Sequence, residues 1–371
     1  MRNIVFLSAL MVLQHFVYAQ EVNDSIIYHQ NQRILQLLES SKISTQIFLG
    51  YRYYVEGNGN FNEFSVKRGY INFEKSLNKY LSGRITPDLT IDKEGDGEGD
   101  LEMRLKYCYV ELKDEGSYGV FTSPKLLIGE VPTPFIDFEE KVNAYRVVAS
   151  QYLDDMKILT SADFGVTTSV LLGGKVDEGY QKTVSNAYPG KFGSIALGVF
   201  NGGGYHALEF NNNKTFQWRL SVRPMPERLP GLQFSYAGAH GKGNTALYPD
   251  WDTHTGFLSY ESRRLVLTGQ LFRSLGNHEG TLADSLGNSY KAKGLNAFLE
   301  VKFLKNRFSL FGAYGVMRYT DYTGTDIEKT REIIGLAYHI YKKNKFVIDL
   351  NRSISNGKCK GVIEFMFELA L

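Results

Sequence analysis

The sequence predicts an all-β fold, a transmembrane antiparallel β-barrel of about 16 strands. Apolar and polar residues alternate with period two along many segments, and the connections between these segments alternate between short and long. Tyrosines gather near the ends of the same segments. Together these observations favour a barrel with short turns at one end and long loops at the other.

The period-two pattern is clearest at 216–222 (FQWRLSV), where four apolar residues alternate with Gln217, Arg219 and Ser221. The same pattern recurs at 81–89, 295–303 and 363–371. Such alternation indicates strands that are apolar on one face and wet on the other.

Sixteen segments are expected to be strands, most of them close to the ten residues that a tilted membrane strand needs. They lie near 43–54, 63–75, 79–91, 101–112, 124–131, 161–173, 192–201, 214–223, 231–239, 254–261, 264–273, 293–304, 307–319, 330–341, 344–352 and 361–371.

The connections support a barrel over a soluble sandwich, because outer-membrane barrels have short periplasmic turns and long extracellular loops. Short connections are expected at 75–79, 261–264, 304–307 and 341–345. Longer ones, rich in Gly, Asn and Asp, are expected near 91–101, 131–161, 201–213, 239–254, 273–293, 319–330 and 352–361. Two connections expected on the short side, 112–124 and 173–192, are too long and break this rhythm.

Tyrosine favours membrane–water interfaces because its ring is apolar and its hydroxyl is wet. The residues near strand ends are Tyr51, Tyr53, Tyr54, Tyr80, Tyr107, Tyr109, Tyr319, Tyr338 and Tyr341. Ordinary β-propensity is the alternative explanation. With the loop asymmetry, aromatic girdles are the better interpretation.

The chain divides into three expected parts. Residues 1–19 have a basic start and a short apolar run, which predicts a signal peptide that directs export through the inner membrane. Residues 20–42 have near-helical apolar spacing and are expected to form a short periplasmic segment. Residues 43–371 are expected to form the barrel.

Composition argues against several classes of function. The 42 Lys and Arg residues nearly balance the 40 Asp and Glu residues, which argues against a nucleic-acid partner. The two cysteines and the scattered histidines lack the spacing of a metal site, so we expect no metal and no cofactor. Ser259 lies near His254, but no nucleophile elbow or triad order is present, so we expect no enzyme.

Several segments in order resemble the phosphate-selective porin O and P family over roughly 60–240. They are 66–73 (VKRGYINF), 81–84 with Asp88, 105–112 (LKYCYVEL), 126–130 (LLIGE) before Pro134 and Phe135, Arg146, 163–166 (DFGV), 199–202 (VFNG), Asn213 with Lys214, and Arg219 with Arg223 and Pro224. Cys108 and the terminal Leu371 depart from the family pattern. The resemblance implies an anion-passing diffusion channel of the bacterial outer membrane, surrounded by lipid and often assembled as a homotrimer.

Alternation places six cations of the first half of the chain on the face toward the lumen: Arg68, Arg84, Arg104, Lys106, Arg219 and Arg223. With Lys302 and Arg331 they number eight. Eight acids share that face: Glu74, Asp88, Glu102, Asp163, Glu300, Asp349, Glu364 and Glu368. The count alone therefore predicts no anion preference, but the cations concentrate in the N-terminal half.

The connection 131–160 is too long for a simple loop, and loops of that length in compact folds are usually functional. We expect it to fold into the lumen and form a constriction. Its acids Asp137, Glu139 and Glu140 would then oppose a set of cations, namely Arg68, Arg84, Arg104 and Arg146. The alternative is a solvated extracellular loop.

These patterns together predict a passive porin for small hydrophilic solutes, which include inorganic anions such as phosphate. The alternative is a non-conducting structural barrel, or an adhesin or other binding protein of the outer membrane. A plug-containing active transporter is disfavoured, because too few residues precede the first expected strand.

Overall fold

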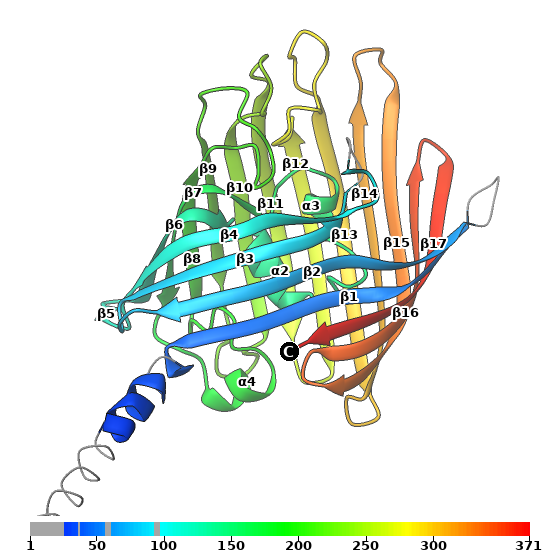
Figure 1. The fold of residues 1–371 in the computed structure, drawn as a ribbon. Helices are drawn as coiled ribbons and strands as arrows, with labels where there is room; N and C mark the ends of the chain where they lie inside the picture. The colour runs from blue at the N-terminus through cyan, green and yellow to red at the C-terminus, as the bar shows by residue number, and fades with distance from the viewer. Residues whose placement is uncertain (1–25, 36–37, 56–60, 93–96) are drawn as a thin grey trace, which may run out of the picture.

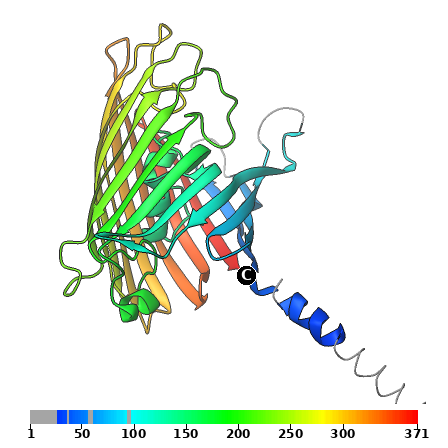
Figure 2. The same ribbon diagram turned by 90° about the vertical axis from the view of Figure 1, so that its left-hand side faces the viewer.

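The computed structural model describes residues 26–35, 38–55, 61–92 and 97–371. Its strands form one closed antiparallel barrel (Figures 1 and 2). Of 17 strands, the two-residue β5 only extends a hairpin, so 16 build the wall. They are β1 (Ser41–Val55), β2 (Asn62–Ser76), β3 (Leu81–Ile91), β4 (Leu101–Lys113), β6 (Phe121–Pro132), β7 (Ala162–Leu172), β8 (Gly193–Phe200), β9 (Thr215–Val222), β10 (Leu232–Lys242), β11 (Asp250–Glu261), β12 (Leu265–Leu275), β13 (Lys291–Phe303), β14 (Phe308–Thr320), β15 (Asp326–Tyr341), β16 (Asn344–Ser355) and β17 (Lys358–Ala370).

The sequence prediction of the fold class is confirmed, because each predicted segment corresponds to one wall strand. Each strand pairs with its neighbour in the chain, and β1 closes the cylinder by pairing with β17 from Gln46 opposite Ala370 to Val55 opposite Gly361. Closure leaves no unpaired sheet edge, which a barrel in lipid requires.

The predicted alternation is also confirmed. In β9, Phe216, Leu220 and Val222 are exposed on the outside, whereas Arg219 and Ser221 are buried inside. In β17, the phenylalanine at 365 is half-exposed, while Glu364, Met366 and Glu368 are buried. The outer surface is therefore apolar where it would meet hydrocarbon.

Two β-bulges interrupt the alternation in strands β2–β4, here called the N-terminal wall. Phe48 pairs with Arg68 and Leu49 with Val66, so Lys67 is an extra residue in β2. Lys106 is likewise an extra residue in β4, opposite the step from Thr86 to Pro87 of β3. Pro87 lacks an N–H donor, so it fits beside a local break in the ladder. Each bulge turns two consecutive side chains toward the lumen.

The two ends of the barrel differ as expected, with some exceptions. The β14–β15 and β16–β17 connections, expected to be long loops, shrink to 321–325 and 356–357 because the strands themselves extend outward. At the short-turn end, β5 (Ser117–Tyr118) lengthens the β4–β6 hairpin. At the same end, α4 (Glu178–Thr183) occupies the β7–β8 connection (Figure 1).

The long β6–β7 connection folds into the barrel, as the sequence analysis predicted. It contains α2 (Ile136–Val142) and α3 (Tyr152–Asp155), which lie within the cylinder in Figure 1. Its apolar residues form one buried core with the inner face of the wall. From the connection this core contains Phe135, Ile136, Phe138, Val142, Tyr145, Val147, Val148, Tyr152, Leu153, Ile158 and Leu159.

Residues 26–35 are helical and extend beyond the short-turn end of the barrel (Figures 1 and 2). The predicted signal peptide at 1–19 lies outside the described residues. Among the residues that the structure describes, no helix has the length and apolar character needed to cross a membrane.

Candidate functional site

The connection between β6 and β7 (residues 133–161, here the constriction loop) packs against one side of the barrel interior. Its Phe135 ring meets Phe257 of β11 edge-on at 5.5 Å between centroids. Tyr145 stacks on Phe311 of β14 at 4.0 Å, and its hydroxyl donates a 2.8 Å hydrogen bond to Glu300. These contacts pack the loop against the inner face of β11–β14.

Arg219, a predicted lumen residue, is enclosed beneath the constriction loop and is 0% exposed. Its Nε donates to the carbonyl of Pro134 at 3.0 Å, and Nη1 donates to Ser194 and Ser221 at 3.0 and 2.6 Å. The guanidinium lies 4.5 Å from the ring centroids of Phe138 and of Tyr188. Arg219 therefore fastens the loop to the wall instead of facing a solute.

Arg223 also points inward but is 2% exposed. Its Nε donates to the carbonyl of Gly190 at 3.2 Å, and its guanidinium lies 5.5 Å from the ring centroid of Tyr180 in α4. Arg223 thus anchors the β7–β8 connection at the short-turn end. Sequence alternation gave its direction correctly, but alternation carries no information about what covers a side chain.

The three acids of α2 take different directions. Glu140 pairs with Arg146 at 3.1 Å and with Lys106 at 3.7 Å. Burial raises the pKa of Glu140, but Arg146 and Lys106 outweigh it and bring that pKa below its usual value. Asp137 accepts a hydrogen bond from Tyr188 and pairs with Lys141 at 3.6 Å.

Glu139 lies on the buried face of α2 and is 2% exposed. Burial, and then the nearby Asp154 and Glu140, raise the pKa of Glu139 to about 8. The expectation that Glu139 opposes the lumen cations therefore does not match its surroundings, because α2 turns this side chain into the packed side of the loop.

The constriction loop and the N-terminal wall meet at one level. The Lys106–Glu140 ion pair crosses from β4 to α2, and Arg146 Nη2 donates a 2.8 Å hydrogen bond to the Tyr70 hydroxyl of β2. Lys67 Nζ donates to the carbonyl of Val148 at 2.5 Å. We refer to this level as the crossing point.

On the long-connection side of the crossing point, two guanidinium groups flank one carboxylate. Arg68 and Arg104 each lie 3.5 Å from Asp88, which also accepts a 3.2 Å hydrogen bond from Tyr205. The side chain of Asp88 is 0% exposed, whereas those of Arg68 and Arg104 are 24% and 23% exposed. The surface offered to a solute here is cationic, with the acid behind it.

On the short-turn side, Arg84 is held by the polar groups of its own wall. Its Nη2 donates to Asn72 at 2.6 Å and its Nε to Thr86 at 2.9 Å. A hollow of about 360 Å³ opens there, and its lining includes Arg84, Asp137 and Lys141. Cations therefore lie on the long-connection side of the crossing point, at its level, and on its short-turn side.

Sequence analysis did not identify a second cluster, in which Arg52 and Lys67 flank Glu364. The distances to Glu364 are 2.8 Å from Arg52 and 2.7 Å from Lys67, and the carboxylate is 0% exposed. Alternation along β1 could have placed Arg52 inward. Lys67 could not be placed inward in this way, because the β2 bulge reverses the expected face.

The fold resembles solved outer-membrane proteins at low sequence identity. An anion-selective porin from Comamonas acidovorans is 10% identical with a TM-score of 0.63, over 90% of this chain and 99% of that chain. OmpF of Salmonella typhi, solved in complex with daunomycin, is 11% identical with a TM-score of 0.60, over 89% and 97%. The trimer form of OmpT, an outer membrane protein of Vibrio cholerae, is 9% identical with a TM-score of 0.54, over 89% and 100%.

A scan against protein-family models finds no match, and a search of curated proteins finds no similar sequence. The structural similarities establish that the chain shares the barrel fold of these proteins. They leave the phosphate-selective family resemblance and the choice of solute as predictions.

Proposed function

We propose that the chain is a porin of the bacterial outer membrane that lets small hydrophilic solutes diffuse, with a preference for inorganic anions such as phosphate. One observation carries the anion preference: on the long-connection side of the crossing point the partly exposed Arg68 and Arg104 lie in front of the buried Asp88. On the short-turn side Arg84 is held by the uncharged side chains of Asn72 and Thr86. This arrangement supports an anion preference even though the total numbers of inward acids and bases are similar.

The route would run between the constriction loop and strands β2–β4. An anion entering from the long-connection end would first meet Arg68 and Arg104, then pass the level of Arg146, and then reach Arg84. Lys106 is 2% exposed, so it holds Glu140 in place and does not itself face the solute. Each cation already has a carboxylate, amide or hydroxyl partner, so an anion would bind weakly and leave readily. Selectivity of this kind comes from clustered charge at the narrow level and requires no covalent step or cofactor.

The structural similarities support this proposal at the level of the fold. The Comamonas protein is named an anion-selective porin, and the Vibrio protein has a trimer form. The resemblance to the phosphate-selective porin O and P family points the same way. We therefore include a homotrimer within the outer-membrane lipid in the proposal.

Reversal potentials across planar bilayers in a KCl gradient test the anion preference. The double variant Arg68→Gln/Arg104→Gln should lower the chloride-to-potassium permeability ratio, because it leaves Asp88 without cationic cover. Lys293→Gln on the outer face is the control and should leave the ratio unchanged. An unaltered ratio in the double variant would contradict the assigned role of this wall.

Liposome swelling separates phosphate from neutral solutes. Proteoliposomes should admit phosphate faster than an uncharged sugar of similar size, and the Arg68→Gln/Arg104→Gln variant should reduce that advantage. Equal rates for both solutes in the unaltered protein would leave a general porin and remove the phosphate preference.

The non-conducting barrel is the second candidate, and the contacts at the crossing point favour it. Lys106–Glu140, Arg146–Tyr70 and Lys67–Val148 join the loop to the opposite wall. A purified protein that inserts into bilayers without ever producing conductance steps would establish this alternative over the porin.

A further inference from the structure

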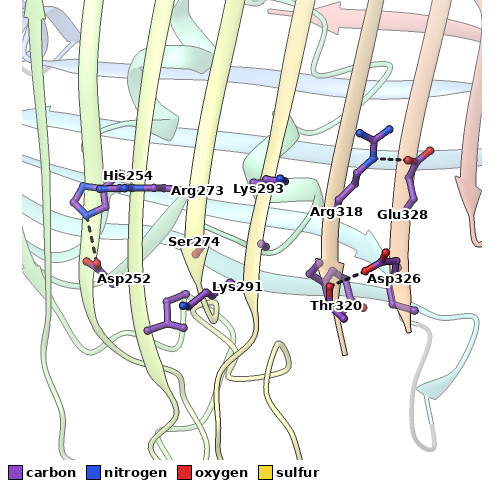
Figure 3. Close-up of a pocket in the computed structure, with 14 residues that line it drawn as sticks. Asp252, His254, Arg273, Ser274, Lys291, Lys293, Arg318, Thr320, Asp326 and Glu328 are labelled. Carbon is purple, nitrogen blue, oxygen red and sulfur yellow. Dashed lines mark hydrogen bonds and ion pairs between the residues drawn. The ribbon is translucent and has the colours of Figure 1, made fainter. Parts of the chain in front are cut away.

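A row of charged residues crosses five strands on the outer surface of the barrel, near the long-connection end. His254, Arg273, Lys293, Arg318 and Glu328 lie directly opposite one another on β11, β12, β13, β14 and β15. Figure 3 shows them side by side in a row across the strands. Their alternation with buried neighbours places them on the outside, away from the candidate pore.

The acids in and beside this row, Asp252, Asp326 and Glu328, lie at its two edges. Glu328 pairs with Arg318 at 2.6 Å, and Asp252 lies 3.3 Å from His254. In the part of the chain that the structure describes, Arg273 and Lys293 have no ion pair with a carboxylate. The same holds for Lys291, which lies two residues nearer the long-connection end of β13.

The central positions of the row are therefore an unbalanced cation cluster. Arg273 faces Lys293, and Lys293 faces Arg318, across adjacent strands about 5 Å apart. Like charges directly opposite one another destabilise a sheet. An anion placed between them would remove this repulsion.

The row lies at the outer edge of the apolar belt. The next outward residues toward the short-turn end are Leu271, Leu295 and Val316, which also face one another across the strands. Exposed apolar residues continue down the same strands to Phe303 and Tyr338. The belt of a membrane barrel is about 25 Å tall and ends where lipid headgroups begin. The cations are therefore at headgroup depth.

A hollow of about 890 Å³ accompanies the row. Its lining includes the three cations without carboxylate partners, together with Thr320, whose hydroxyl donates to Asp326 at 2.7 Å. Lysine ammonium and arginine guanidinium groups are both strong phosphate ligands.

We infer that this hollow binds the phosphate-bearing headgroup of a lipid in the leaflet at the long-connection end. The phosphate lies over Arg273, Lys293 and Lys291, and the acyl chains descend over Leu271 and Leu295. The inference goes beyond the proposed channel and rests only on the membrane location of the barrel. It requires no conduction.

Native mass spectrometry of the full chain in detergent tests this inference with bisphosphorylated lipid A as the probe. The unaltered protein should retain this lipid more strongly than the same lipid after enzymatic removal of its phosphates. Arg273→Gln/Lys293→Gln should weaken retention about 25-fold, because each basic residue near an anionic surface contributes about fivefold. Arg263→Gln/Arg264→Gln, at the other end of β12, is the matched control and should retain lipid normally.

Two results would overturn the inference: equal retention of the phosphorylated and dephosphorylated lipids, or equal loss in the two double variants. A separate competition experiment adds inorganic phosphate at millimolar concentration and measures whether it displaces the bound lipid. If it displaced the lipid completely and bound alone with the same dependence on Arg273, the site would be a free-phosphate site. Because retention is measured without a bilayer current, a failed lipid test and a failed channel test are distinguishable.

Discussion

Glu139 and Glu140 are neighbours in sequence, but their carboxyl groups have opposite surroundings. Glu140 meets Arg146 and Lys106 and stays ionised, whereas Glu139 is packed into the buried face of α2. The helix turns consecutive residues about 100° apart, so one carboxyl faces the lumen and the other faces the core. A shift of one position along α2 therefore decides whether a carboxylate faces the candidate pore or lies in the packed core, where its charge lowers the stability of the fold.

Glu139→Gln should make the stability of the protein less dependent on pH. In the unfolded chain the Glu139 pKa is near 4.5, and in the folded chain it is about 8. The contribution of the protonated Glu139 to the free energy of unfolding is fully present below pH 4.5. It is lost as the pH rises through 8, at up to about 1.4 kcal/mol per pH unit. The melting temperature in detergent should therefore rise in the variant more at pH 9 than at pH 5.

Glu140→Gln is the comparison, because the lowered pKa of Glu140 reverses the sign. This variant should lose stability at pH 7 to 9, where the unaltered carboxylate is paired, and approach the unaltered protein in acid. If Glu139→Gln shifted the melting temperature equally at pH 5 and pH 9, the buried environment assigned to Glu139 would be wrong.

The constriction loop is an element whose position depends on contacts distant in sequence. Its aromatic residues pack on β11–β14, and Arg219 of β9 holds its beginning through Pro134 and Phe138. At the short-turn end, Tyr188 of the β7–β8 connection packs its ring on Phe138 of the loop and donates a hydrogen bond to Asp137. The loop is therefore fixed from both ends of the cylinder.

Arg219→Met should loosen the start of the constriction loop while leaving the barrel intact. The variant keeps an apolar stem but leaves the carbonyl of Pro134 and two serine hydroxyls without their donor, at a cost of about 1–3 kcal/mol. Amide hydrogen exchange in residues 135–143 should accelerate at least about tenfold. Arg264→Met in the exposed β11–β12 turn is the control, and unchanged exchange in Arg219→Met would contradict the fastening role.

Sequence patterns predict the strands well because the lipid-facing and inner faces impose a period of two on each one. They predict the inward folding of residues 131–160 because its length and composition are unlike those of a simple loop. They fail at Lys67, where a bulge changes the face, and at Glu139, where helix rotation decides the environment. They also give no sign that Tyr205 reaches Asp88, because this contact joins the β8–β9 connection to strand β3, which is far away in sequence.

At the scale of the whole molecule, the barrel is complete only when β1 pairs with β17. Gly50 lies within this seam, opposite Met366. A Cβ added at Gly50 would lie 2.4 Å from both the Phe365 carbonyl oxygen and the Met366 sulfur. The carbonyl belongs to the ladder that closes the cylinder, so it cannot move aside without weakening that ladder.

Gly50→Val should therefore impair closure of the barrel, since a β-branched side chain adds two methyl groups where even one carbon does not fit. The fraction of refolded protein that migrates as a compact species on unheated SDS gels should fall strongly relative to the unaltered chain. Gly269→Val is the matched control, because a Cβ there meets no atom within 4 Å and β12 lies away from the seam. Equal folded fractions for the two variants would show that the seam tolerates a side chain at Gly50, and the close approach of β1 and β17 at this position would then not limit closure.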